Sequence, residues 1–393
     1  MNRILTALIL FTTFQAAAQK FNNLALTPPM GWNSWNKFAC ENVNEKVLRD
    51  MADAMISSGM KSAGYEYVVI DDCWQIGRDS AGNILADPKK FPSGIKALAD
   101  YIHNKGLKFG IYSCAGNQTC ALRPGSRGFE FQDARQYAAW GVDYLKYDWC
   151  HTTTQSAQES YTLMRDAIYK AGRPIVFSLC EWGLSKPWLW AADVGHLWRT
   201  SGDILNSWNA PDAKEGKVWG GGVVINLDMM KGLEIYAGPG RWNDPDMLEV
   251  GNGVLTPEKD KSHFSLWCML AAPLMTGNDL SKMTPATKAI LTNKEVIAID
   301  QDKLGKQGYK ILDELEYEIF LKPLSSGDTA ICLFNRSNKV KNAEVKWSDY
   351  KISSEFRIRD LWQHKDVGNT ATPLKVQIPI HGVQLYRLHK REL

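Results

Sequence analysis

The sequence predicts an α/β fold, in which a (β/α)8 TIM barrel is followed by a C-terminal antiparallel β-sandwich domain. The chain has 393 residues, a length that suits one large domain and one smaller domain. Short apolar, β-rich segments alternate with helical patterns as far as about residue 300, as in parallel strands joined by crossover helices. After residue 302 the hydrophobic pattern changes to a period of two, which is typical of antiparallel strands.

Eight β-rich segments predict the strands of the barrel. They lie at 29–32, 67–70, 109–112, 144–147, 175–179, 196–200, immediately before Asp244, and at 271–276. Amphipathic patterns between them predict helices, such as the pattern at 47–56, which follows an N-cap at Asn44 and ends at Gly59. Two further helical patterns stop at Gly106 and Gly141. A barrel fits better than a doubly wound sheet, because no GxGxxG motif follows the first strand.

The domain boundaries follow from composition. A basic start at 1–3, an apolar run at 4–14 and three alanines at 16–18 have the layout of a signal peptide. The run is shorter than the roughly 18–20 apolar residues that span a bilayer, so we expect an exported chain without a membrane anchor, periplasmic or extracellular. We expect the signal peptide at 1–18, the catalytic barrel at 19–306 and the β domain at 307–393, which would pack against the barrel and stabilise it.

The net charge, and the spacing of the cysteines, histidines and glycines, argue against nucleic acid, membrane, metal and nucleotide partners. The formal net charge of +3 gives no field strong enough to suggest nucleic acid or an anionic membrane. Eight cysteines are too scattered for a disulfide scaffold, and seven dispersed histidines form no HExxH or HxH motif. Gly220, Gly221 and Gly222 lack the spacing of a phosphate-binding loop and are interpreted as loop glycines. We therefore expect no metal and no other cofactor, and a neutral or small partner.

Acidic and aromatic residues follow four of the predicted strands. They form the segments Asp71-Asp72-Cys73-Trp74, Tyr147-Asp148-Trp149, Cys180-Glu181-Trp182 and Thr200-Ser201-Gly202-Asp203. In a TIM barrel such strand ends meet at one face, so we expect an acidic pocket with aromatic walls, partly compensated by Lys146 and Arg199. A pocket of this kind suits a neutral sugar, because carboxylates accept hydroxyl protons and rings stack on the apolar sugar face. Two carboxylates that flank a glycosidic bond are the minimum equipment for cleaving it.

Seven segments, in order, are similar to those of one known family. They are LTPPMGWNSW (26–35), YVVIDDCW (67–74), GIY (110–112), LKYDWC (145–150), CEW (180–182), RTSGD (199–203) and WNDPDM (242–247). Together they resemble glycoside hydrolase family 27 of clan D, the melibiase-type α-galactosidases. The resemblance covers about residues 24–306 and implies a retaining, exo-acting hydrolysis of terminal α-linked galactose in oligosaccharides or polysaccharides.

The resemblance also implies roles for individual residues. Asp148 would be the nucleophile and Asp203 the general acid/base, so Asp148 should start ionised and Asp203 protonated. We expect Lys146 to favour the anion at Asp148, and Asp203 to lie in a less charged, partly desolvated setting. The implied substrate-binding residues are Trp35, Asp71, Asp72, Tyr112, Lys146, Glu181, Leu184, Arg199, Asp246 and Met247. The implied disulfides are Cys40–Cys73 and Cys120–Cys150, and the buried free thiols would be Cys114, Cys180, Cys268 and Cys332.

The sequence leaves three alternatives to an α-galactosidase: two with other substrates and one without catalysis. Relatives that act on α-N-acetylgalactosamine have small residues where this chain has Glu181 and Leu184. Relatives that prefer β-L-arabinopyranose change one member of the pair that corresponds to Asp71 and Asp72, and this chain keeps both. The third alternative is a catalytically silent galactose-binding protein on the same fold. The residues therefore favour plain galactose as the substrate and hydrolysis as the activity.

Overall fold

The computed structural model describes residues 20–214, 216–352 and 356–390. The predicted signal peptide at 1–18 lies outside the described residues. None of the helices in the described part of the chain is long and apolar enough to cross a membrane.

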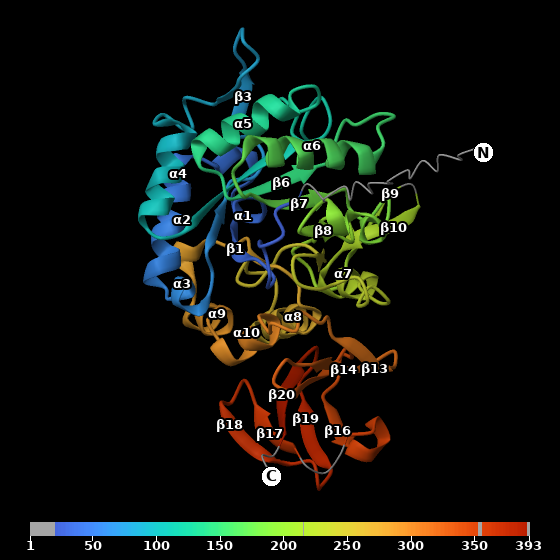
Figure 1. Ribbon diagram of the computed structural model, residues 1–393. Coiled ribbons are helices and arrows are strands. Elements are labelled where there is room, and N and C mark those ends of the chain that lie inside the picture. The colour runs from blue at the N-terminus through green and yellow to red at the C-terminus, as the bar shows by residue number, and fades with distance from the viewer. Residues whose placement is uncertain (1–19, 215, 353–355, 391–393) are drawn as a thin grey trace, which may run out of the picture.

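Eight parallel strands form the barrel that the sequence predicts (Figure 1). They are β1 (Met30–Asn33), β2 (Tyr67–Val69), β5 (Lys108–Cys114), β6 (Tyr144–Asp148), β7 (Val176–Cys180), β8 (Leu197–Arg199), β11 (Trp242–Asp244) and β12 (Leu274–Thr276). Neighbours follow the order β11-β8-β7-β6-β5-β2-β1-β12. A parallel bridge between Leu248, which follows β11, and Thr276 in β12 joins the two ends of this sheet. Each of the eight predicted strand segments is thereby confirmed.

Apolar side chains on both faces explain why these short segments form strands. Val68, Phe109, Ile111 and Leu145 are fully buried between the barrel interior and the surrounding helices. Strands that are covered on both faces read as nearly continuous apolar runs, which is the pattern seen in the sequence. All eight strands run in the same direction, so their carboxyl ends meet at one face of the barrel.

Helices cover the outside of the barrel (Figure 1). They are α1 (Trp35–Asn42), α2 (Glu45–Ser57), α3 (Met60–Ala63), α4 (Gly94–Asn104), α5 (Glu130–Trp140), α6 (Ala157–Ala171), α7 (Val223–Met229), α8 (Pro257–Leu270), α9 (Pro285–Leu291) and α10 (Lys294–Asp300). The predicted N-cap of α2 is confirmed, because the Asn44 side chain accepts a hydrogen bond from the Val47 amide at 3.0 Å. Gly141 caps the end of α5 in a left-handed conformation.

Two hairpins extend from the loops of the barrel. One pairs β3 (Gln75–Arg78) with β4 (Ile84–Ala86), and the other pairs β9 (Pro211–Lys214) with β10 (Lys217–Gly221). The interpretation of Gly220 and Gly221 as loop glycines was wrong, since both lie in β10. Glycine is needed there because a Cβ on Gly220 would lie 2.7 Å from the backbone of Gly202.

The C-terminal region is an antiparallel β-sandwich. Its larger sheet has the order β13 (Tyr309–Asp313), β14 (Tyr317–Pro323), β15 (Thr329–Asn335), β20 (Val383–Lys390), β17 (Phe356–Asp360) and β18 (Lys365–Asn369). The smaller sheet pairs β16 (Lys341–Val345) with β19 (Leu374–Ile378). Apolar residues of the larger sheet, including Phe334 and Leu385, belong to the same buried cluster as the barrel, and α8 packs against β15 and β20 (Figure 1).

Polar contacts reinforce this packing. The buried ammonium of Lys322 in β14 donates to the carbonyl of Cys268 in α8 at 2.9 Å. The Trp362 indole donates to Ser265 Oγ at 3.0 Å. Together with the shared apolar cluster, these contacts fix the β-sandwich to α8.

Replacing Asn44 with alanine should lower the free energy of unfolding by about 1 kcal/mol, because one amide at the start of α2 loses its acceptor. Asn44→Asp keeps a side-chain acceptor and should stay close to the wild type. Urea unfolding followed by far-ultraviolet circular dichroism measures both variants. An alanine variant as stable as the aspartate variant would show that this cap contributes nothing.

Candidate active site

The carboxyl ends of the barrel strands surround a cavity of about 310 Å3. Its lining comes from the ends of six strands and the loops that follow them. The lining residues are Trp35, Asn36, Ala39, Asp71, Asp72, Tyr112, Cys120, Lys146, Asp148, Arg199, Asp203, Ile204, Leu205, Asn206, Asp246, Met247 and Glu249. The barrel strands and the loops that follow them therefore gather residues that are more than 200 positions apart in the sequence.

Asp148 is the last residue of β6; it is buried and lines the cavity. The Tyr112 hydroxyl donates to Oδ2 at 2.7 Å, and the Trp149 amide donates to Oδ1 at 2.9 Å. Burial disfavours the anion and raises the pKa of Asp148 to about 6, although Lys146 and both hydrogen bonds act in the opposite direction. The expected effect of Lys146 on Asp148 is present, but desolvation outweighs it.

Lys146 forms an ion pair with Asp71 and also interacts electrostatically with Asp148 and Asp246. Its ammonium lies 2.8 Å from Asp71 Oδ2, which also accepts a hydrogen bond from Asn33 Nδ2 at 2.7 Å. Burial alone would lower the pKa of Lys146, but the nearby carboxylates, led by Asp71, raise it well above the usual value. The lysine is therefore a permanent cation among carboxylates, and its side chain is only 16% exposed.

Asp72 is held by backbone amides from two segments. Oδ1 accepts from the Cys73 amide at 2.7 Å, and Oδ2 accepts from the Ala121 amide at 3.0 Å. Burial raises the pKa of Asp72. Both segments are covalently fixed, because the predicted disulfides Cys40–Cys73 and Cys120–Cys150 are present.

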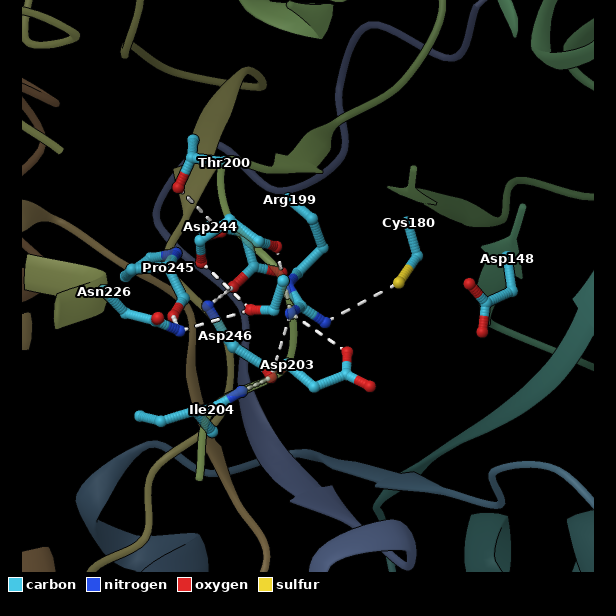
Figure 2. Close-up of polar contacts among 12 residues, drawn as sticks. Asp148, Cys180, Arg199, Thr200, Asp203, Ile204, Asn226, Asp244, Pro245 and Asp246 are labelled. Atoms are coloured by element: carbon cyan, nitrogen blue, oxygen red, sulfur yellow. Dashed lines mark hydrogen bonds and ion pairs between the residues drawn. The ribbon is translucent and has the colours of Figure 1, made fainter. Parts of the chain in front are cut away.

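Arg199, at the end of β8, organises the opposite wall (Figure 2). Its Nη2 lies 3.0 Å from Asp246 Oδ2 and 3.2 Å from Asp203 Oδ1. Asp246 also accepts from the Ile204 amide at 2.7 Å, and its own amide donates to Asp244 Oδ1 at 2.9 Å. Burial raises the pKa of Asp244 to about 6, whereas the buried Arg199 stays protonated because carboxylates surround it.

The setting of Asp203 differs from the expectation. Its side chain is 53% exposed and lies beside the Arg199 guanidinium, so it is neither desolvated nor remote from charge. The physical reason is its position four residues beyond the end of β8, in a loop at the rim. Figure 2 shows its carboxylate extending from the Arg199 cluster toward Asp148. A substrate that fills the cavity would remove water from this carboxyl.

Eight of the ten residues predicted to bind substrate line the cavity, and Glu181 and Leu184 do not. The Glu181 carboxylate is buried, accepts from the Ser185 amide at 2.6 Å and has its pKa raised by burial to about 7. Leu184 is 64% exposed. Both lie in the segment that follows β7.

Sequence reasoning missed several lining residues, of which Glu249 is the most polar. Its carboxylate accepts from the side-chain amides of Asn36 and Asn252, and burial raises its pKa to about 7. Glu249 lies five residues beyond the end of β11. An inspection of the sequence for acidic residues finds it only if it includes the whole loop after the strand.

One group of side chains in the described chain has the spacing of a metal site, formed by Cys120, Asp148 and Cys150. The two cysteines form a disulfide with each other, so they offer no thiolate ligand. The remaining four cysteines, Cys114, Cys180, Cys268 and Cys332, are buried and unpaired, as expected.

Comparison with known proteins identifies the family. Residues 27–302 match the family model described as alpha galactosidase A, and residues 314–388 match the alpha galactosidase C-terminal beta sandwich domain. The chain belongs to the melibiase-type α-galactosidases, glycoside hydrolase family 27. This membership confirms the family predicted from the seven sequence segments.

Individual family members are similar over nearly their whole length. Alpha-galactosidase A of Cellvibrio japonicus is 54% identical, and the match covers 97% of this chain and 96% of that protein. Alpha-galactosidase of Cyamopsis tetragonoloba is 47% identical over 94% of this chain and 88% of its own. The crystal structure of α-galactosidase I from Mortierella vinacea superposes with a TM-score of 0.90 at 40% identity, covering 94% of this chain and 98% of that one.

Replacing Tyr112 with phenylalanine should raise the pKa of Asp148 above its value of about 6, because the hydroxyl bonds to the ionised form. Carbon-13 NMR titration of labelled aspartate carboxyls, assigned with Asp148→Asn, measures the shift. Tyr144→Phe is the matched control, since Tyr144 is buried in the same barrel and is not among the groups that shift the pKa of Asp148. An Asp148 pKa that is unchanged or lower in Tyr112→Phe would contradict this assignment.

Proposed function

We propose that the chain is a retaining, exo-acting α-galactosidase that removes terminal α-linked galactose from oligosaccharides or polysaccharides. The observation that carries this proposal is that Asp148 and Asp203 line one cavity in two different settings. Asp148 is buried and held by two donors, whereas Asp203 is half exposed at the rim. A fixed internal carboxylate suits nucleophilic attack, and a rim carboxyl suits proton exchange with a leaving group and with water.

In the first step, Asp148 attacks the anomeric carbon of the bound galactosyl residue. The bond to the leaving oxygen breaks as the ester to Asp148 forms, and Asp203 donates its proton to that oxygen. Tyr112 and the Trp149 amide hold the attacking carboxylate in one orientation, which limits the freedom that must be lost on reaction. The anomeric centre is inverted once.

In the second step, Asp203 accepts a proton from a water molecule that attacks the same carbon. The ester to Asp148 breaks, Asp148 returns as a carboxylate, and the second inversion restores the α configuration. The position of Asp203 at the rim supports this step, because solvent reaches its carboxyl without displacing the buried walls.

The sugar hydroxyls would be read by the remaining polar walls. By resemblance to the family, Asp71 and Asp72 would bind O6 and the axial O4, and Lys146 the O3/O4 edge. Glu181 and Arg199 would bind the O2 side, with Asp246 nearby. An equatorial O4, as in glucose, would leave a buried carboxylate unpaired at a cost of roughly 1–3 kcal/mol. A cavity of about 310 Å3 bounded in this way suits one terminal sugar residue.

Two other substrates test the limits of this specificity. We propose plain galactose over α-N-acetylgalactosamine because the relatives that act on the latter have small residues where this chain has Glu181 and Leu184, and over β-L-arabinopyranose because Asp71 and Asp72 are both present. The test compares kcat/KM on the 4-nitrophenyl glycosides of α-galactose, α-N-acetylgalactosamine and β-L-arabinopyranose. A higher value on either of the last two would show that galactose is not the preferred sugar. Galactose binding with no turnover above that of Asp148→Asn would favour the silent lectin.

We further propose that residues 1–18 direct export, so that the mature chain acts in the periplasm or outside the cell. The layout of the first 18 residues and two disulfides support this destination. The proposed boundaries are 19–306 for the barrel and 307–393 for the β domain, supported by the change from parallel to antiparallel strands between β12 and β13.

Azide should distinguish the two carboxylates. In Asp148→Gly, azide takes the place of the nucleophile and should give β-galactosyl azide; in Asp203→Gly, it attacks the galactosyl ester and should give α-galactosyl azide. With 4-nitrophenyl α-galactoside as substrate, NMR identifies the products, and Asp100→Gly on the exposed face of α4 is the control. If Asp148→Gly gave the α-azide and Asp203→Gly the β-azide, the two roles would be reversed. If neither variant gave an azide product, the result would contradict the proposed mechanism.

The acid limb of the pH profile should report the ionisation of Asp148. The nucleophile acts as an anion, so kcat/KM should fall about tenfold per pH unit below about 6, where Asp148 becomes protonated. Assays between pH 4 and 8, with activity rechecked after return to pH 7, separate titration from unfolding. An acid limb centred near pH 4 would show that Asp148 is not desolvated in solution.

A further inference from the structure

The β9–β10 hairpin is hydrogen-bonded to both sides of Asp203. The Gly202 amide donates to the Trp219 carbonyl at 2.5 Å, and the Leu205 amide donates to the Gly221 carbonyl at 2.8 Å. The contact is close enough that a Cβ on Gly202 would lie 2.6 Å from the Trp219 indole ring. The indole ring therefore lies directly against the residue that precedes Asp203.

Two further side chains complete a cluster around this ring. Trp182, from the loop after β7, meets Trp219 edge to face with ring centroids 5.4 Å apart. The ammonium of Lys214 in β9 lies 3.3 Å from the centroid of Trp219 and 5.6 Å from that of Trp182. Lys214 is exposed and both tryptophans are half-buried, so aromatic surface and a cationic donor lie together at the rim.

The position of this cluster next to Asp203 suggests what it binds. A general acid protonates the leaving oxygen, so the leaving group must lie on the side of the cavity where Asp203 stands. Aromatic rings stack on the C–H faces of sugars, and an ammonium donates to their hydroxyls. None of the three residues lines the galactose-sized cavity itself.

We propose that Trp182, Trp219 and Lys214 form a subsite for the leaving-group sugar, the ring joined to galactose through the scissile bond. The proposal rests on the acid/base role proposed for Asp203. It makes the chain selective for galactosyl saccharides over galactosides with small or non-sugar leaving groups. Lys214 moves from the indole face to the sugar hydroxyls when the subsite is filled.

The test compares raffinose with methyl α-galactoside, whose leaving oxygen needs the same protonation by Asp203 but whose methyl group is too small to reach the hairpin. In Trp219→Ala the ratio of kcat/KM for raffinose to kcat/KM for the methyl galactoside should fall about tenfold, and in Lys214→Ala a few-fold. Trp219→Phe keeps a ring and should lose less. Val218→Ala is the matched control, because Val218 is the exposed neighbour of Trp219 in the same strand.

Two results would overturn the subsite. An equal loss on both substrates would mean that Trp219 only positions Asp203, and an unchanged ratio would mean that the hairpin does not touch the leaving group. Failure of the wild type to turn over either substrate would instead contradict the proposed function on which the subsite depends.

Discussion

The buried ammonium of Lys146 is the group on which the acidic cavity depends. Asp71, Asp148 and Asp246 all stabilise its charge, and without it three carboxylates would face one another with Arg199 as the other cation in the lining. Burying unpaired ions costs several kcal/mol each, so such a cluster holds together only around a compensating charge. Lys146 also restrains the pKa of Asp148, which burial would otherwise raise further. The same lysine thereby stabilises the cavity and helps to keep the nucleophile Asp148 ionised near neutral pH.

The barrel strands hold the polar side chains of the cavity in fixed positions. Tyr112 and Asp148 lie on neighbouring strands, β5 and β6, and Arg199 reaches Asp203 and Asp246 from β8. Such contacts depend on strand register, which the buried faces of the strands fix. Two disulfides then fix the loops that hold Asp72 and cover Asp148, so that the polar groups are in place before a sugar arrives.

Strand positions could be predicted from the sequence because each buried strand is a short apolar run, and because Gly141 and Gly172 end the helices before β6 and β7. The acidic residues that end β2, β6 and β8 were readable for the same reason. Glu249 and the β9–β10 hairpin were not, because they belong to loops whose path depends on tertiary contacts rather than on periodicity. The surroundings of Asp203 were misjudged for a related reason, since its exposure follows from a loop that leaves the barrel after Arg199.

The buried Asp148, rather than a carboxylate at the rim, should form the covalent bond to the sugar. A fluorinated galactosyl fluoride that forms the ester quickly and hydrolyses slowly would trap this species, and mass spectrometry of proteolytic peptides would locate it. We expect one fluorinated galactosyl group per chain, attached to Asp148 in the segment 145–150. Attachment to Asp203 or Asp246, or inactivation without any covalent label, would contradict it.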